Sequence, residues 1–188
     1  MRHKYTTRAL VLGRTPHGEA NLLASLLTQD LGLIRARSQG ARKPGAKMAA
    51  GMQTLALADV TLLRGKEGWR MAGSVLEENW SKQLSKDARK RAARVAGLAE
   101  RLVRGEHADP ELFHLISAFF AALAVVSEDV GEDAEALAAL RLLQSLGHDA
   151  GDTFGAVDDY SEHALALAAE NRTALIARIN TAIAASGL

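Results

Sequence analysis

The stretch that decides the fold of the first half is TTRALVLGRTPHGEANLLASLLTQDLGLIRARSQ, residues 6–39. Apolar runs alternate here with turn signals at residues 15–18 (TPHG) and 29–32 (QDLG). Short apolar runs bounded by Gly, Pro, Asn or Asp are typical of β-strands. We therefore predict strands over Thr6–Gly13, Asn21–Thr28 and Leu33–Gln39.

The strand pattern continues toward residue 79. Two further runs, Leu55–Leu63 and Trp69–Leu76, flank the turn signal RGKEG at residues 64–68. This half contains no helical segment long enough to cover a sheet face, and a sheet that closes on itself leaves few unpaired edges. The first half is therefore predicted to form a small closed barrel of five strands.

The second half differs in composition. It holds 24 of the 36 alanines, in residues 92–188, and alanine is the strongest helix former. Its apolar residues recur at helical spacing, and possible caps include Asp109 before Pro110, Gly147, and Asn171. We predict an α+β protein with a barrel domain over residues 1–79 and an all-α domain over residues 80–188. The expected helices cover residues 81–104, 110–126, 133–146, 161–170 and 171–186.

The net charge of +1 conceals a strong asymmetry between the halves. Residues 1–91 carry 17 Lys and Arg against 7 Asp and Glu, whereas residues 92–188 carry 6 against 15. A basic segment joined to an acidic one indicates a polyanion-binding module attached to a part with another role.

Several classes of protein are excluded. Without cysteine the chain has no disulfide, thiol nucleophile or cysteine-ligated metal. The segment GARKPGAK at residues 40–47 approaches a phosphate-binding loop but has Ala46 where that loop needs Lys. Glu111 and His114 have the spacing of a di-iron pair, yet no second copy exists. We predict no enzymatic activity, no cofactor and no metal.

A membrane span is also not expected. The longest apolar run, residues 118–126 (AFFAALAVV), is too short to cross a bilayer, and the first residues lead into a polar stretch rather than a signal-peptide core. The default expectation is a soluble cytoplasmic protein.

Basic residues of the first half form the candidate nucleic-acid site. Arg35 and Arg37 share one face of their strand, because successive strand side chains point to opposite faces. Cations that neutralise several phosphates release counterions, which gives affinity without sequence preference. Single cations are often only solvated surface, so the prediction depends on the cluster. It also includes Arg14, Arg42, Lys43, Lys47, Arg64, Lys66 and Arg70.

Two parts of this site have alternative interpretations. Trp69 either stacks a base or packs in the core, and the scarcity of aromatic residues in the barrel favours mainly electrostatic binding. The basic helix over residues 81–104 contributes Lys86, Arg89, Lys90 and Arg94. These four cations either extend the DNA surface or neutralise the acidic domain.

Certain landmarks are shared with a known family. They are Gly18-Glu19-Ala20, Gly32, a glycine followed by basic residues at 40–43, and ALRLLQSLGH at residues 139–148. In these features the chain resembles the family of the bacterial DNA repair protein RecO. The resemblance implies an N-terminal OB-fold, binding of single- and double-stranded DNA, strand annealing and help in loading the recombinase RecA. It also implies two partners, RecR and the acidic C-terminal tail of the single-stranded DNA-binding protein, and a cytoplasmic, nucleoid-associated location.

The chain departs from the family pattern at one place. Many members carry a cysteine-ligated zinc module after the Leu-Gly turn, whereas residues 149–160 here contain no cysteine. A short loop without metal is expected, and the chain is identified as a short form without that module. Two other functions stay open. One is a general OB-type module that binds RNA or structured nucleic acid, and the other is a protein adapter whose basic half docks an acidic partner.

Overall fold

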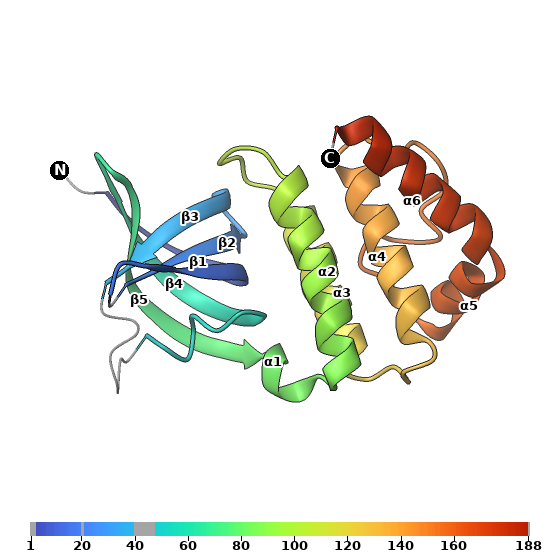
Figure 1. The fold of residues 1–188 in the computed structure, drawn as a ribbon, viewed down its shortest axis with the longest axis horizontal. Helices are drawn as coiled ribbons and strands as arrows, with labels where there is room; N and C mark the ends of the chain where they lie inside the picture. Colours follow the sequence, from blue (N-terminus) through green and yellow to red (C-terminus); the bar gives the residue numbers. More distant parts are fainter. Residues whose placement is uncertain (1–2, 20, 40–47, 188) are drawn as a thin grey trace. The chain divides into compact units, whose positions relative to one another are not determined.

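The computed structural model describes residues 3–19, 21–39 and 48–187. The chain divides into two compact units, one of residues 1–83 and 104–110 and the other of residues 84–103 and 111–188. The predicted α+β order is confirmed, since five strands are followed by helices along the chain (Figure 1).

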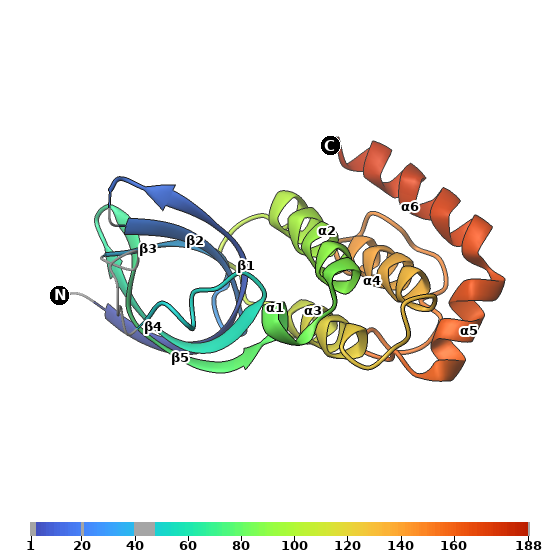
Figure 2. The same cartoon turned by 60° about the horizontal axis from the view of Figure 1, so that its bottom comes forward.

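The five strands close into a barrel in the order β1-β2-β3-β5-β4. Every neighbouring pair is antiparallel except β3 and β5, which run parallel. This closed five-stranded ring confirms the predicted OB-fold and is seen from another side in Figure 2. The strands are β1 His3–His17, β2 Asn21–Thr28, β3 Gly32–Ser38, β4 Ala56–Gly65 and β5 Gly68–Asn79.

The first strand is longer than predicted at both ends and closes the ring. Its first half pairs with β4 and its second half with β2, and a bulge between Val11 and Gly13 helps the strand to bend between them. The predicted turn at residues 15–18 is wrong, because Pro16 still pairs with Leu22 and the chain reverses only at Gly18. Proline is tolerated near a strand end, where few ladder hydrogen bonds remain to be made.

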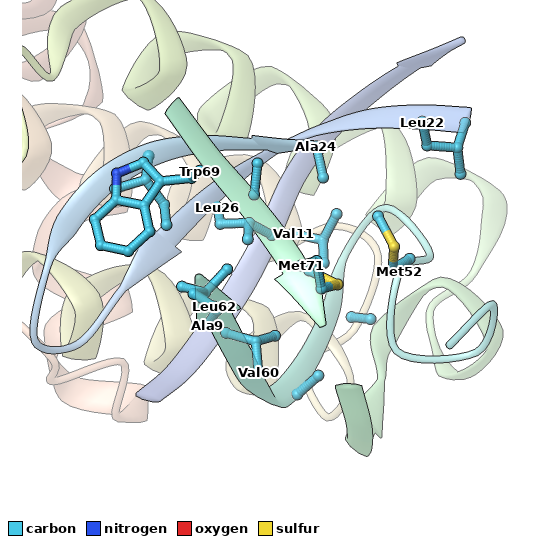
Figure 3. Close-up of a cluster of buried hydrophobic side chains, with 14 residues drawn as sticks. Ala9, Val11, Leu22, Ala24, Leu26, Met52, Val60, Leu62, Trp69 and Met71 are labelled. Atoms are coloured by element: carbon cyan, nitrogen blue, oxygen red, sulfur yellow. The ribbon is translucent and has the colours of Figure 1, made fainter. Parts of the chain in front are cut away.

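The barrel interior is filled by alternate residues of all five strands. Small alanines from four strands leave room for the larger side chains, so that a narrow ring can be packed without voids. Trp69 and Met52 lie on opposite sides of this cluster (Figure 3). Its strand members are Ala9, Val11, Leu22, Ala24, Leu26, Ile34, Ala36, Ala56, Ala58, Val60, Leu62, Trp69 and Met71.

Six helices follow the barrel strands in the described part of the chain. The helix α4 lies between α2 and α6 (Figures 1 and 2). Within the described ranges no helix has both the length and the apolar character needed to cross a bilayer. The helices are α1 Trp80–Gln83, α2 Lys86–Leu102, α3 Pro110–Leu123, α4 Gly131–Ser145, α5 Glu162–Glu170 and α6 Arg172–Ser186.

Local capping explains where the helices differ from prediction. The expected helix over residues 81–104 is two helices, because the hydroxyl of Ser85 accepts the Ala88 backbone N–H at 3.2 Å and starts α2 anew. Asn171 was predicted to cap α6 but makes no such bond. Its side-chain amide donates instead to the carbonyl of Leu167 at the end of α5. Gly147, with φ of 76°, follows α4 as predicted.

The segment 104–110, between α2 and α3, belongs to the barrel unit. It passes over Gly32, the first residue of β3, which has φ of 74°. A Cβ atom at Gly32 would overlap the backbone carbonyl group of His107. Glycine is therefore required at this position both by its left-handed backbone and by the approach of a second backbone.

Replacing this glycine should loosen the segment from the barrel. We expect Gly32→Ala to lower the free energy of unfolding by about 2 kcal/mol, from a strained φ together with backbone overlap. Gly18→Ala is the matched control, since φ is 68° there and a Cβ would meet nothing within 4 Å. Urea denaturation of both variants measures the difference, and equal losses would contradict the role of the His107 contact.

Candidate nucleic-acid interface

A hollow of about 880 Å³ opens at one end of the barrel. It lies where β2 and β5 begin and β3 and β4 end, so residues far apart in sequence line the same space. Five predicted site residues are among them: Arg37, Arg64, Lys66, Trp69 and Arg70. Among the described lining residues Glu67 is the only acid, so the hollow carries an excess of positive charge.

The strand register explains why these cations meet. In the parallel pair, Arg37 of β3 lies opposite Arg70 of β5, and in the antiparallel pair Arg64 of β4 lies opposite Trp69. The side chains of β3 alternate as predicted, with Arg35 and Arg37 more exposed than the buried Ile34 and Ala36. The barrel therefore places cations from three strands beside one another, an arrangement suited to an anionic polymer.

Each arginine of the hollow already has a polar partner. Arg37 donates to the backbone carbonyl of Glu67 at 2.7 Å and lies 3.2 Å from its carboxylate. Arg70 reaches the side-chain oxygen of Gln39 at 3.5 Å. These partners are exposed, and exposed pairs contribute only about 0–1 kcal/mol. A phosphate can therefore replace them at little cost.

Trp69 lies in the barrel core with 7% of its surface exposed. The ring of Tyr5 meets it edge-on at 5.2 Å between centroids, and the guanidinium carbon of Arg64 lies 4.8 Å from the ring centroid of Trp69. Of the two interpretations of Trp69, this is the packing arrangement. A base could stack on the ring face beneath Arg64 only by displacing that guanidinium group.

Other predicted residues do not line the hollow. Arg35 is exposed on the outer face of β3, and Arg14 is exposed on β1, where its guanidinium is 3.4 Å from the carbonyl oxygen of Met52. Arg42, Lys43 and Lys47 lie outside the described residues.

The basic helix α2 belongs to the other unit, and part of its charge is matched within that unit. Arg94 makes two hydrogen bonds to Glu135 of α4, at 2.5 and 2.6 Å, and the bond to Glu135 raises the pKa of Arg94. Arg91 lies 3.7 Å from the same carboxylate. These contacts fit the charge-neutralising interpretation of the helix for Arg91 and Arg94.

The other three cations of α2 that were predicted to bind DNA all lie on its exposed surface. Lys90 pairs with Asp87, one turn earlier, at 2.7 Å. Lys86 and Arg89 are exposed as well. Contact of all three with nucleic acid stays a prediction.

Sequence reasoning missed several residues around the hollow. His3, His17, Asn21 and Gln39 line it, and they were not singled out because isolated polar residues at strand ends carry no local signal. Glu106 was missed for a different reason. It forms an ion pair with Arg64 although it lies in the segment between α2 and α3, and only the folded chain brings the two together.

No metal site was found in the part of the chain that the structure describes, since no three His, Asp or Glu side chains group together there. The hollow therefore offers cations, amides and imidazoles for binding an anion.

Comparison with known proteins gives a consistent result. Residues 1–71 match the family model for the N-terminal part of recombination protein O. The DNA repair protein RecO of Heliobacterium modesticaldum is 32% identical over 145 residues, which cover 77% of this chain and 52% of the relative. RecO of Synechococcus elongatus is 39% identical over 120 residues, 62% of this chain and 44% of the relative.

A third relative, RecO of Dehalococcoides mccartyi, is 34% identical over 119 residues, 61% of this chain and 46% of the relative. The chain thus spans about half the length of the curated relatives that it matches. The matched segment includes the described residues that line the hollow, and the barrel has the OB-fold that the resemblance implied. The chain is therefore similar to RecO proteins, and its residues 1–71 match the N-terminal part of recombination protein O.

Proposed function

We propose that this protein is a non-enzymatic DNA repair and recombination mediator that binds single-stranded DNA at the barrel hollow. The observation that carries the proposal is the meeting of Arg37, Arg64, Lys66 and Arg70 around one hollow, where strand register sets Arg37 beside Arg70. Each cation can face one phosphate of an extended strand, and none reads a base edge.

Binding of this kind tolerates any sequence. A backbone-directed surface leaves the bases exposed, and it reduces the repulsion between two complementary strands held close together. Strand annealing follows from the same surface. A fluorescence assay with complementary oligonucleotides tests it, and binding without faster pairing would remove annealing from the proposal.

The sharpest test of DNA binding is its salt dependence. If about five phosphates are neutralised, log affinity should fall against log salt with a slope of about −3.5, or roughly a hundredfold between 50 and 200 mM. Fluorescence anisotropy with a labelled oligo-dT measures this directly. A slope near zero, or no binding in dilute buffer, would contradict the proposed function.

The same assay separates the other candidate functions. Preference for RNA over DNA oligonucleotides in competition would indicate a general OB-type module. DNA binding that survives charge reversal at Arg35, Arg37, Arg42 and Lys43 would favour an adapter whose basic surface docks an acidic protein.

Assistance in recombinase loading needs partner proteins as well as DNA. We extend the proposal to RecR, to the acidic C-terminal tail of the single-stranded DNA-binding protein, and indirectly to RecA, as the family resemblance implies. Isothermal titration with a synthetic tail peptide and with purified RecR tests the first two. Absence of heat with both would restrict the protein to DNA binding alone.

A further inference from the structure

The segment 104–110 brings a carboxylate to the rim of the proposed DNA site. Glu106 of this segment forms an ion pair with Arg64, which lines the hollow. Sequence separates the two residues by 42 positions. The ion pair therefore depends on the packing of this segment against the barrel.

Arg64 is held in place for this contact. Its guanidinium carbon lies 4.8 Å from the ring centroid of the buried Trp69, so the cation packs against an aromatic ring. The carboxylate of Glu106 pairs with a terminal nitrogen of the same guanidinium group. A carboxylate and a phosphate both present oxygen pairs to a guanidinium, and each would use the same donors.

Glu106 is presented by an anchored segment rather than by a loose one. The backbone of its neighbour His107 approaches Gly32 so closely that a Cβ on Gly32 would overlap it. The carboxylate is therefore kept near Arg64, at a high local concentration. The ion pair itself is weak, because the two side chains are 45% and 44% exposed.

These observations define a competition. We propose that Glu106 is an internal competitor for the DNA strand at Arg64, so that a bound phosphate displaces the Glu106 carboxylate and the carboxylate limits affinity. This inference rests on the proposed function, since it concerns the same site. Because the pair is exposed, displacement is easy, and the residue tunes binding rather than preventing it.

The test compares two neutralised glutamates by anisotropy with labelled oligo-dT. Glu106→Gln should bind roughly threefold to tenfold more tightly than wild type at 50 mM salt, because Arg64 no longer has an anionic partner. Glu77→Gln is the matched control. Glu77 also belongs to the barrel unit and pairs with an arginine, Arg8, at 2.7 Å, and neither residue lines the hollow. The Glu77→Gln variant should change the affinity for oligo-dT by less than about twofold.

A double-mutant cycle separates competition at Arg64 from a general effect of charge. In an Arg64→Gln background, Glu106→Gln should alter affinity less than about twofold, since the shared group is gone. Equal tightening with and without Arg64, or equal affinities of the Glu106→Gln and Glu77→Gln variants, would overturn the inference. Wild-type protein that fails to bind in dilute salt would instead refute the proposed function.

Discussion

Neutralising Arg37, Arg64 and Arg70 together, each to Gln, is expected to weaken binding of oligo-dT about a hundredfold at 50 mM salt. Each lost phosphate contact is an exposed charge pair and costs about 0.9 kcal/mol, so removing three contacts costs about 2.7 kcal/mol, which is about a hundredfold in affinity. The slope of log affinity against log salt should fall from about −3.5 to about −1.4, since only two of about five phosphates remain neutralised.

The control for this variant changes the same number of charges elsewhere. Arg94, Arg101 and Arg172 lie on helices of the other unit, and replacing them with Gln removes three positive charges without touching the hollow. We expect a loss of less than about fivefold, from the weaker overall field. Anisotropy measures both variants, and circular dichroism establishes that they are folded. Similar losses in the two proteins would show that total charge, rather than the hollow, governs binding.

The second large effect is expected for Arg141→Met, which should lower the free energy of unfolding by about 3 kcal/mol. Arg141 of α4 is fully buried, and its guanidinium donates to three backbone carbonyls of the segment that follows α4. The acceptors are Thr153 at 3.0 Å, Phe154 at 2.8 Å and Asp159 at 2.5 Å. Methionine fills part of the space but leaves three carbonyl groups without their donor.

Burial of the Arg141 guanidinium changes the pKa values of this group and of its neighbour Tyr160. Burial lowers the pKa of Arg141 and raises the pKa of the Tyr160 hydroxyl, whose ring centroid lies 5.3 Å from the guanidinium carbon. An arginine keeps its charge under these conditions because its ordinary pKa is far above neutrality. Its planar fork can serve several carbonyls at once, so Arg141→Lys should not restore the lost stability.

Urea denaturation and limited proteolysis measure the Arg141→Met effect. We expect new cleavage within residues 149–160, the segment that Arg141 and its neighbour Gln144 hold by hydrogen bonds. Arg101→Met is the control, because Arg101 is exposed and donates only to the carbonyl of Gly97 among the bonds described. An unfolding free energy equal to that of the control would show that this segment is held by other contacts.

The sequence pattern predicted a strand well where buried and exposed residues alternate regularly along it. The strand of Arg35 and Arg37 was predicted within one residue at each end, and its alternation is confirmed. The first strand was predicted too short because its polar ends are held only by neighbours, β4 on one side and β2 on the other. Asn171 stands at the N-cap position of α6 as predicted, but its side chain bonds back to α5, because an asparagine between two helices can bond in either direction.

The candidate site could be predicted only in part. Five of its cations and aromatic residues were named from charge and turn position, but which of them meet could not be predicted. Arg35 and Arg37 were expected to act together, whereas the hollow brings Arg37 beside Arg70 through the parallel pairing of β3 with β5. Pairing between strands so distant in sequence is set by the register of the whole ring, which no local window contains.

The amino-acid sequence by itself determined the order of strands and helices, the basic character of the first half and the two faces of the strand that carries Arg35 and Arg37, because periodicity and composition act over a few residues. Tertiary structure alone decided the parallel register of β3 with β5, the ion pair of Arg64 with Glu106 and the burial of Arg141. These features depend on contacts between distant segments, which form only when the free energy of packing outweighs the entropy of bringing those segments together.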